Sequence, residues 1–180
     1  MALRKASSYS KKRVHPFTRN SKRKNKSFIK TIPPHKIVKF VMGNEQLFTD
    51  GKLPYHLTVV SAENCQIRHN ALEACRQFIN KKLEKEFVGQ YLFHVVPYPH
   101  HIQRENKMLT GAGADRMQTG MQLSFGKSIG KAAIVKTGSK IFFVAIASQK
   151  GAAFARKTIK QVKSKLPCKI RIHEELVKAK

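Results

Sequence analysis

Acidic side chains are scarce in this sequence of 180 residues, which holds 10 Asp and Glu against 36 Lys and Arg. The formal net charge is therefore +26. A small chain with so much charge of one sign repels itself, and such charge is normally sustained by a polyanionic partner. Tryptophan is absent, and we find no internal repeat. The length suits one domain with terminal extensions.

Cysteine is also rare, since the chain has only Cys65, Cys75 and Cys168. Three isolated cysteines cannot form the disulfide framework of a small secreted domain, so a reducing, cytoplasmic location is expected. No Cys-x-x-Cys pair is present, and neighbouring histidines such as His100 and His101 point to opposite sides of an extended chain. Because a zinc site needs three or four converging ligands, the sequence predicts neither a metal nor a cofactor.

Long hydrophobic runs are missing as well. The longest strongly apolar run, Ile141 to Ala147, is far shorter than the roughly 20 residues of a membrane-spanning helix. The N-terminus is basic, but no apolar segment follows the charge, so it does not match a secretory signal. We therefore expect no association with a membrane.

The first 30 residues carry eleven basic side chains and no acidic one. Serine is frequent there and aliphatic residues are few, so this segment cannot bury enough surface to fold alone. We interpret it as an arm that neutralises phosphates and releases counterions. A solvated leader and an organelle transit peptide are the alternatives. The candidate phosphate-binding residues of the arm are Lys11, Lys12, Arg13, Arg19 and Arg23.

Residues 31–173 are predicted to form a single α+β domain of short mixed strands and two amphipathic helices, followed by a short tail at 174–180. Ser61 or Asn64 is expected to cap the first helix, which Gly89 ends, and Ser148 is expected to cap the second helix, at about 151–165. The predicted strands are 37–42, which a turn at Gly43-Asn44 closes, 55–61, 91–96, 121–125, 132–136, 141–147 and 168–173.

The second predicted helix has two chemically different faces. Its inward face is predicted to carry Phe154, Thr158, Ile159 and Val162. Its outward face is predicted to carry Arg156, Lys157, Lys160 and Lys163. A cationic face of this kind suits phosphate groups, and a merely solvated face is the alternative.

Enzyme motifs are not completed anywhere in the sequence. Gly120 and Gly126 have five residues between them, whereas a phosphate-binding loop needs four. The segment from Gly111 to Gly113 lacks the third glycine of a dinucleotide fingerprint. Carboxylates for acid–base catalysis are also lacking, because only Glu105 and Asp115 lie in the candidate loop and each is next to an arginine. We therefore predict that the chain is not an enzyme.

Residues 104–120 have no hydrophobic period and are predicted to form a long loop rich in Gly, Asn, Asp and Thr. Arg and Lys offer contacts to phosphate, Asn and Gln can bond base edges or 2′-hydroxyls, and glycine lets RNA approach the backbone closely. The alternative is a flexible surface loop in which Arg116 merely pairs with Asp115.

The same loop carries the most specific pattern in the chain. Gly113-Ala114-Asp115-Arg116 is followed by Gln118-Thr119-Gly120-Met121, and the flanking segments read Arg104-x-Asn106-Lys107-Met108-Leu109 and Phe125-Gly126-Lys127. This pattern strongly resembles the large-subunit ribosomal protein family called L-ten-e in archaea and eukaryotes and L-sixteen in bacteria. Its form points to the archaeal and eukaryotic branch, and the likeness extends over about 28–173.

The resemblance implies an α/β-hammerhead fold and a non-enzymatic role in the large ribosomal subunit. It implies contact with large-subunit rRNA, neighbouring ribosomal proteins and assembly factors, and late joining during subunit assembly. It places the loop matching 104–120 near the tRNA acceptor arms and the peptidyl transferase centre. Carried over position by position, the RNA-binding residues are Arg104, Asn106, Lys107, Gly111, Gly113, Asp115, Arg116, Gln118, Thr119 and Lys127.

Two other classes of function predict different behaviour. A free RNA-binding or assembly factor that only visits the ribosome would leave the subunit at modest salt. An enzyme acting on RNA, with the loop as its active site, would show turnover. We favour a resident rRNA-binding protein that docks electrostatically through its arm, its core and its second helix.

Overall fold

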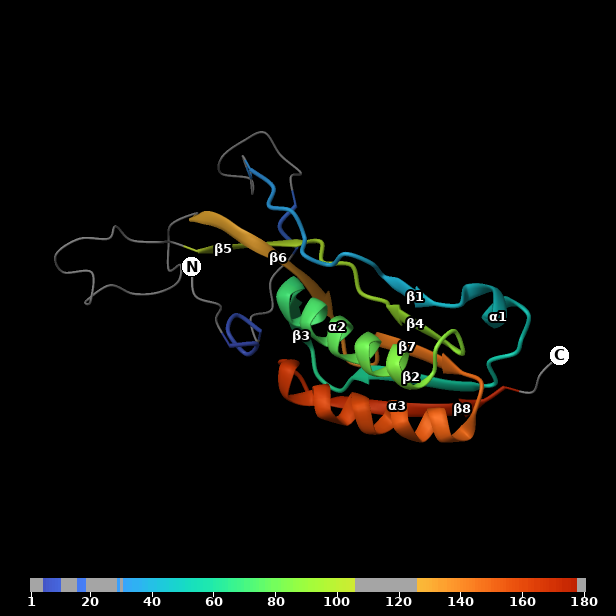
Figure 1. Ribbon diagram of the computed structural model, residues 1–180. Helices are drawn as coiled ribbons and strands as arrows, with labels where there is room; N and C mark the ends of the chain where they lie inside the picture. The colour runs from blue at the N-terminus through green and yellow to red at the C-terminus, as the bar shows by residue number, and fades with distance from the viewer. Residues whose placement is uncertain (1–4, 11–15, 19–28, 30, 106–125, 178–180) are drawn as a thin grey trace.

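In a computed structural model of this protein, the structure describes residues 5–10, 16–18, 29, 31–105 and 126–177. Within these residues the strands form two antiparallel sheets, and two long helices lie against the larger sheet (Figure 1). The elements in chain order are β1 (Val41–Gly43), α1 (Glu45–Thr49), β2 (Tyr55–Ser61), β3 (Cys65–Arg68), α2 (His69–Glu86), β4 (Tyr91–Val95), β5 (His101–Glu105), β6 (Lys127–Val135), β7 (Lys140–Ile146), α3 (Gln149–Val162), the 3₁₀ turn η2 (Lys163–Lys165) and β8 (Ile170–Leu176).

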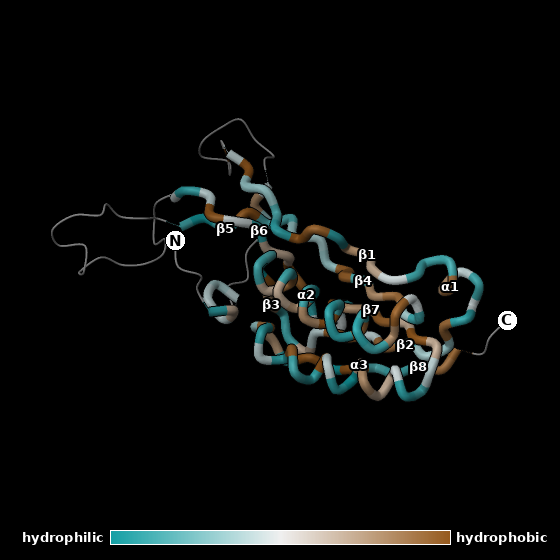
Figure 2. Tube along the Cα trace, viewed as in Figure 1, coloured by the Kyte–Doolittle hydropathy of each residue, from teal (hydrophilic) through white to brown (hydrophobic). Residues whose placement is uncertain are grey.

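The larger sheet has the strand order β1-β4-β7-β2-β8, and α2 and α3 run side by side along one of its faces (Figure 1). The helices pack there through apolar side chains. In α2 an apolar residue recurs every three or four positions, and Leu72, Ile79 and Leu83 are fully buried. Phe93 of β4 and Phe142 of β7 meet these helices from the sheet. Figure 2 shows hydrophobic stretches along the central strands and hydrophilic residues recurring along α3.

The opposite face of this sheet has a small hydrophobic cluster near α1. Leu53, Leu92 and Ala145 form a small buried cluster there, against which Phe48 and Phe143 pack. The side chain of Asn44 caps α1 by accepting a hydrogen bond from the backbone N–H of Leu47.

The smaller sheet has the strand order β3-β6-β5, and its β5–β6 pair projects beyond the end of α2 (Figure 1). β6 is long enough to pair with β3 through Ala132 to Val135 and with β5 through Lys127 to Ala132. At the root of this pair, the space beside Gly130 is limited, because an added Cβ would lie 3.2 Å from the imidazole of His69. The smaller sheet is therefore packed closely against His69, the first residue of α2.

The α+β class is confirmed, and the strands at 55–61, 91–96 and 141–147 lie close to their predicted places. Ser148 caps α3 as predicted, since its Oγ accepts a hydrogen bond from the backbone N–H of Gly151 at 3.1 Å. The expectation of mixed strand directions is wrong, because all pairings of the described strands are antiparallel. Both predicted helices are present, as α2 and α3, and a short third helix that was not predicted, α1, follows the turn at Gly43.

The predicted start of the first helix is wrong. Ser61 and Asn64 do not cap it: the Ser61 hydroxyl donates to the carbonyl of Glu63, and the Asn64 side chain accepts from the backbone N–H of Thr137. The next four residues pair with β6 as β3, so α2 begins only at His69. The helix also ends at Glu86, before the predicted stop at Gly89.

Several strand boundaries differ from the prediction. The first strand begins at Val41 rather than residue 37, β6 begins at Lys127 rather than residue 132, and β8 runs on to Leu176, into the predicted tail. β5 was missed, so Arg104 and Glu105 belong to a strand and not to the predicted loop. The predicted strand at 121–125 and the rest of that loop lie outside the described residues.

Candidate nucleic-acid interface

The β5 strand carries the first of the predicted RNA-binding residues, Arg104. Its guanidinium lies over the ring of Phe17, with 4.1 Å between the guanidinium carbon and the ring centroid, a cation–π contact. Across the pair, Arg104 is opposite Ser128, and the neighbouring Glu105 is opposite Lys127. The structure therefore brings Arg104 and Lys127, 23 positions apart in sequence, onto adjacent positions of one strand pair.

Described parts of the first 30 residues are docked on the smaller sheet. The hydroxyl of Tyr9 donates to Oε1 of Glu105 at 3.1 Å, and the backbone N–H of Gln66 donates to the carbonyl of Ser10 at 3.0 Å. The side-chain amide of Gln66 also donates to the carbonyl of Tyr9. Because Gln66 is on β3 and Glu105 is on β5, residues 5–10 contact two strands of this sheet.

A second docking contact involves Phe17 and His101. The backbone N–H of Phe17 donates to Nδ1 of His101 at 3.0 Å, and the carbonyl of Phe17 accepts from the backbone N–H of Ile102 at 2.9 Å. Sequence reasoning missed Tyr9, Phe17, Gln66 and His101 as residues that position this region. The available signal was the presence of aromatic residues in an otherwise basic segment, because the side chains of Tyr9 and Phe17 contact the sheet.

Burial keeps His101 neutral. It lowers the pKa of His101 from 6.5 to about 4, with smaller contributions from the positive charges of His100 and Arg104. Burial likewise lowers the pKa of His69 to about 4, assisted by Lys36 and Arg68. A neutral imidazole is required at position 101, since its Nδ1 must be free of a proton to accept from Phe17.

We expect the chain to lose stability as the pH falls from about 6.5 to about 4. The unfolded state takes up a proton on His101 below its ordinary pKa of 6.5, whereas the folded state resists until about 4. Stability is therefore greater above this window and falls through it, by up to about 3 kcal/mol per histidine. His101→Asn keeps an acceptor and removes the titration, so urea unfolding between pH 4 and 7 should show a shallower slope. An unchanged slope would contradict the assignment.

The cationic face of α3 is solvent-exposed as predicted, and Thr158, Ile159 and Val162 are buried beneath it. Phe154 also faces inward as predicted, since it is half-buried and packs against the core. On the cationic face, Arg156 forms an ion pair, since its Nη1 lies 2.9 Å from Oε1 of Glu174 on β8. Among the described residues, no acidic partner lies within ion-pair distance of the three lysines of this face. We call these the α3 lysines: Lys157 and Lys160 on α3, and Lys163 at its C-cap.

The structure places four predicted site residues on two separate surfaces: Arg104 and Lys127 on the β5–β6 pair, and Arg156 and Lys160 on α3. The other predicted residues lie outside the described residues: Lys11, Lys12, Arg13, Arg19, Arg23, Asn106, Lys107, Gly111, Gly113, Asp115, Arg116, Gln118 and Thr119. Within the described part of the chain, no group of three His, Cys, Asp or Glu side chains could hold a metal ion. No helix found there is long and apolar enough to cross a membrane.

Comparison with known proteins gives one consistent family. The family model described as Ribosomal protein L16p/L10e matches residues 16–173. Among similar proteins, the large ribosomal subunit protein uL16 of Methanoculleus marisnigri is 49% identical over 146 residues, which cover 80% of this chain and 82% of that protein. The protein of the same name from Sulfolobus acidocaldarius is 45% identical over 150 residues, 82% of each chain. That from Methanococcus maripaludis strain C7 is 41% identical over 174 residues, 94% of each.

Proposed function

The chain belongs to the L16p/L10e family of large-subunit ribosomal proteins, in its archaeal form, and from this membership we propose that it binds large-subunit rRNA and supports the tRNA-binding region. The family is structural, so the chain is a constituent of the large ribosomal subunit and not an enzyme. In archaea that subunit is cytoplasmic. The observation that carries the proposal is the family match across residues 16–173 of a chain with net charge +26.

The mechanism we propose has two steps. Residues 1–30, the β5–β6 pair and the α3 lysines first neutralise rRNA phosphates, which releases counterions. The segment 104–120 is then placed near the tRNA acceptor arms and the peptidyl transferase centre by shape. The RNA-contacting residues proposed there are Arg104, Asn106, Lys107, Gly111, Gly113, Asp115, Arg116, Gln118, Thr119 and the adjacent Lys127.

Support for this mechanism comes from the docking of the N-terminal segments. Tyr9 and Phe17 contact β5, the strand that leads directly into the proposed tRNA-proximal segment. Tyr9 and Phe17 attach the arm to β5, from which the tRNA-proximal segment extends. Phosphate binding by the arm would therefore also hold this strand in place. We also propose that the two sheets constitute the family's α/β-hammerhead, carried by residues 31–173, with residues 1–30 as the rRNA-binding arm.

The test of residence is sedimentation of a cell lysate through sucrose gradients at moderate and high salt, with and without RNase. We expect stoichiometric comigration with large subunits that survives high salt and is lost after RNase. Release at modest salt would instead support a visiting factor. A chain found at the top of every gradient would contradict residence in the subunit.

The roles of the arm and of the tRNA-proximal segment can be distinguished by mutation. Arg116→Ala removes a proposed RNA contact near the tRNA, so we expect it to slow translation by purified ribosomes more than it lowers the amount of chain in subunits. Deletion of residues 1–26 removes phosphate contacts of the arm and should mainly lower incorporation. Both quantities can be read from the same gradient fractions. Normal translation by Arg116→Ala subunits would refute the role proposed for the segment.

A further inference from the structure

Exposed hydrophobic side chains are unevenly distributed over this protein. Eight large hydrophobic residues are exposed within the described ranges, and five of them lie either just before and within β1 or just after β4. Single exposed hydrophobic residues need no explanation, but a group on one surface marks an interaction site. We call this group the β1 strip: Ile32, Val38, Val41, Val96 and Tyr98.

The two segments of the β1 strip are adjacent in space. Val41 is the register partner of His94 on β4, and the backbone N–H of Val95 donates to the carbonyl of Phe40 at 2.8 Å. Further along, the ring of Tyr98 is 5.7 Å from that of Phe40 and 5.4 Å from that of His35, measured between centroids. The segment before and within β1 therefore lies side by side with the segment that follows β4.

β1 is an edge strand, since the order of the larger sheet begins with it and its one partner among the described strands is β4 (Figure 1). The carbonyl of Phe40 and the N–H of Asn44 bond to Val95 and Tyr91, so the backbone polar groups of even-numbered residues face β4. Those of Lys39, Val41 and Gly43 consequently face the open edge, where another strand could pair with them.

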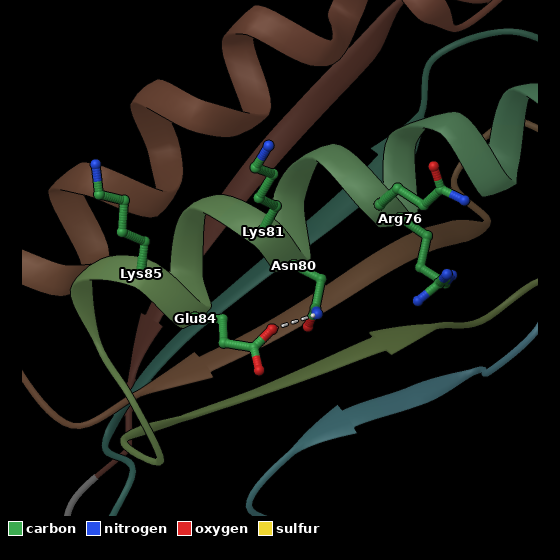
Figure 3. A pocket seen from close by; sticks show the side chains of 6 residues that line it. Arg76, Asn80, Lys81, Glu84 and Lys85 are labelled. Carbon is green, nitrogen blue, oxygen red and sulfur yellow. Dashed lines mark hydrogen bonds between the residues drawn. The ribbon is translucent and has the colours of Figure 1, made fainter.

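The segment that leads into β1 and includes it carries charge of one sign. Residues 31–44 contain the exposed Lys36 and Lys39 and no acidic residue. A cavity of about 380 Å³ lies along the neighbouring side of α2, and Figure 3 shows Arg76 and Asn80 pointing from α2 toward β4 and β1. The charge of Arg76 is matched by Glu73, with Nη2 and Oε1 2.6 Å apart. Among the described residues, no acidic side chain lies within ion-pair distance of Lys36 or Lys39.

We propose that the β1 edge is a docking site for an extended peptide segment of a partner protein, which adds to the larger sheet as a sixth strand. The main-chain groups of Lys39, Val41 and Gly43 would pair with it, and its β-branched side chains would cover Val38 and Val41. Its acidic side chains would face Lys36 and Lys39. RNA is the poorer occupant, because aliphatic side chains dominate the strip and offer nothing to phosphates. This surface is separate from the RNA-binding surfaces proposed above.

The test uses photocrosslinking in purified large subunits. Val38 and, in a second chain, Val88 are replaced by p-benzoyl-L-phenylalanine; both positions are 74% exposed, and Val88 lies after α2, away from the strip. Incorporation of each chain is first read by sedimentation, and the fraction that contains it is irradiated. We expect position 38 to crosslink to a protein segment with more acidic than basic residues and alternating β-branched ones. Position 88 should give no such product.

Two further variants in the chain that is photoreactive at position 38 test how the segment binds. Val41→Pro removes an outward N–H and leaves the bonds to β4 intact, so it should lower the crosslink yield about fivefold. Lys36→Glu with Lys39→Glu should lower it by about the same factor, whereas the control Lys81→Glu with Lys85→Glu changes charge equally and should not.

Each other outcome overturns the docking proposal: a crosslink to rRNA, a crosslink to a basic segment, equal yields at positions 38 and 88, or yields that Val41→Pro leaves unchanged. Failure of the proposed function is distinguished by the sedimentation step, which precedes irradiation. If the proposed function is wrong, the chain is absent from the large-subunit fraction.

Discussion

Replacing the α3 lysines with glutamine should weaken binding of the chain to large-subunit rRNA by about a hundredfold near 0.1 M salt. These lysines are exposed on α3 and at its C-cap, and they have no acidic partner among the described residues, so their charge is available to phosphates. Because fewer counterions are then released on binding, the salt dependence should also become less steep, by roughly 2 to 3 in the slope of log K against log salt. Filter binding to rRNA over a salt series measures both quantities.

The chain offers a matched control for this experiment. Arg156, Lys52 and Lys169 are also surface cations, but each lies within ion-pair distance of a carboxylate: Glu174, Asp50 and Glu63 in turn. Replacing these three with glutamine removes the same formal charge from groups whose charge is already matched. We expect a much smaller loss of affinity. Equal losses in the two triple variants would mean that total charge, and not the unmatched charge of the α3 lysines, determines binding.

Gly43→Ala should destabilise the fold by roughly 3 to 5 kcal/mol. Gly43 has φ +93°, a conformation that residues with a side chain rarely adopt, and an added Cβ would overlap the carbonyl oxygen of Tyr91 on β4. Since that oxygen also accepts from the backbone N–H of Asn44 at 2.8 Å, neither strand can move away without breaking the β1–β4 pairing. The measurement is the free energy of unfolding in urea.

A substitution at Gly89 separates the two causes of this loss, the strained backbone conformation and the overlap with Tyr91. It has a similar positive φ of +70°, but nothing lies within 4 Å of the position that a Cβ would occupy. Gly89→Ala should therefore cost only about 1 to 2 kcal/mol, the cost of the backbone conformation alone. If both variants lost the same stability, the close approach of β1 to β4 would not be what requires glycine at position 43.

The elements that were predicted from sequence are those whose side-chain period is complete within one segment. α3 shows this well: its apolar residues, its cationic face and its cap at Ser148 all follow from fewer than twenty neighbouring residues. β7 was identified for the same reason, since an uninterrupted run of apolar residues is typical of a strand buried in a sheet.

β3 and β5 could not be found in this way. Residues 65–68 continue into the apolar period of α2, and residues 101–105 follow a proline-rich corner, so neither carries a strand pattern of its own. Both become strands because β6 lies between them and supplies hydrogen bonds on each side. Strand pairing depends on partners that are distant in sequence, and local periodicity contains no information about them.

By itself the sequence determined the α+β class, the cationic face of α3 and, through the pattern between Arg104 and Lys127, the protein family. The tertiary structure alone decided how the N-terminal segments are held: Phe17 meets His101 84 positions away, and Tyr9 meets Glu105 96 positions away. It alone decided that β1 is an edge with outward backbone groups. The physical reason is common to these cases. Charge and periodicity are properties of neighbouring residues, whereas a hydrogen-bond partner or an open sheet edge exists only once distant segments have come together.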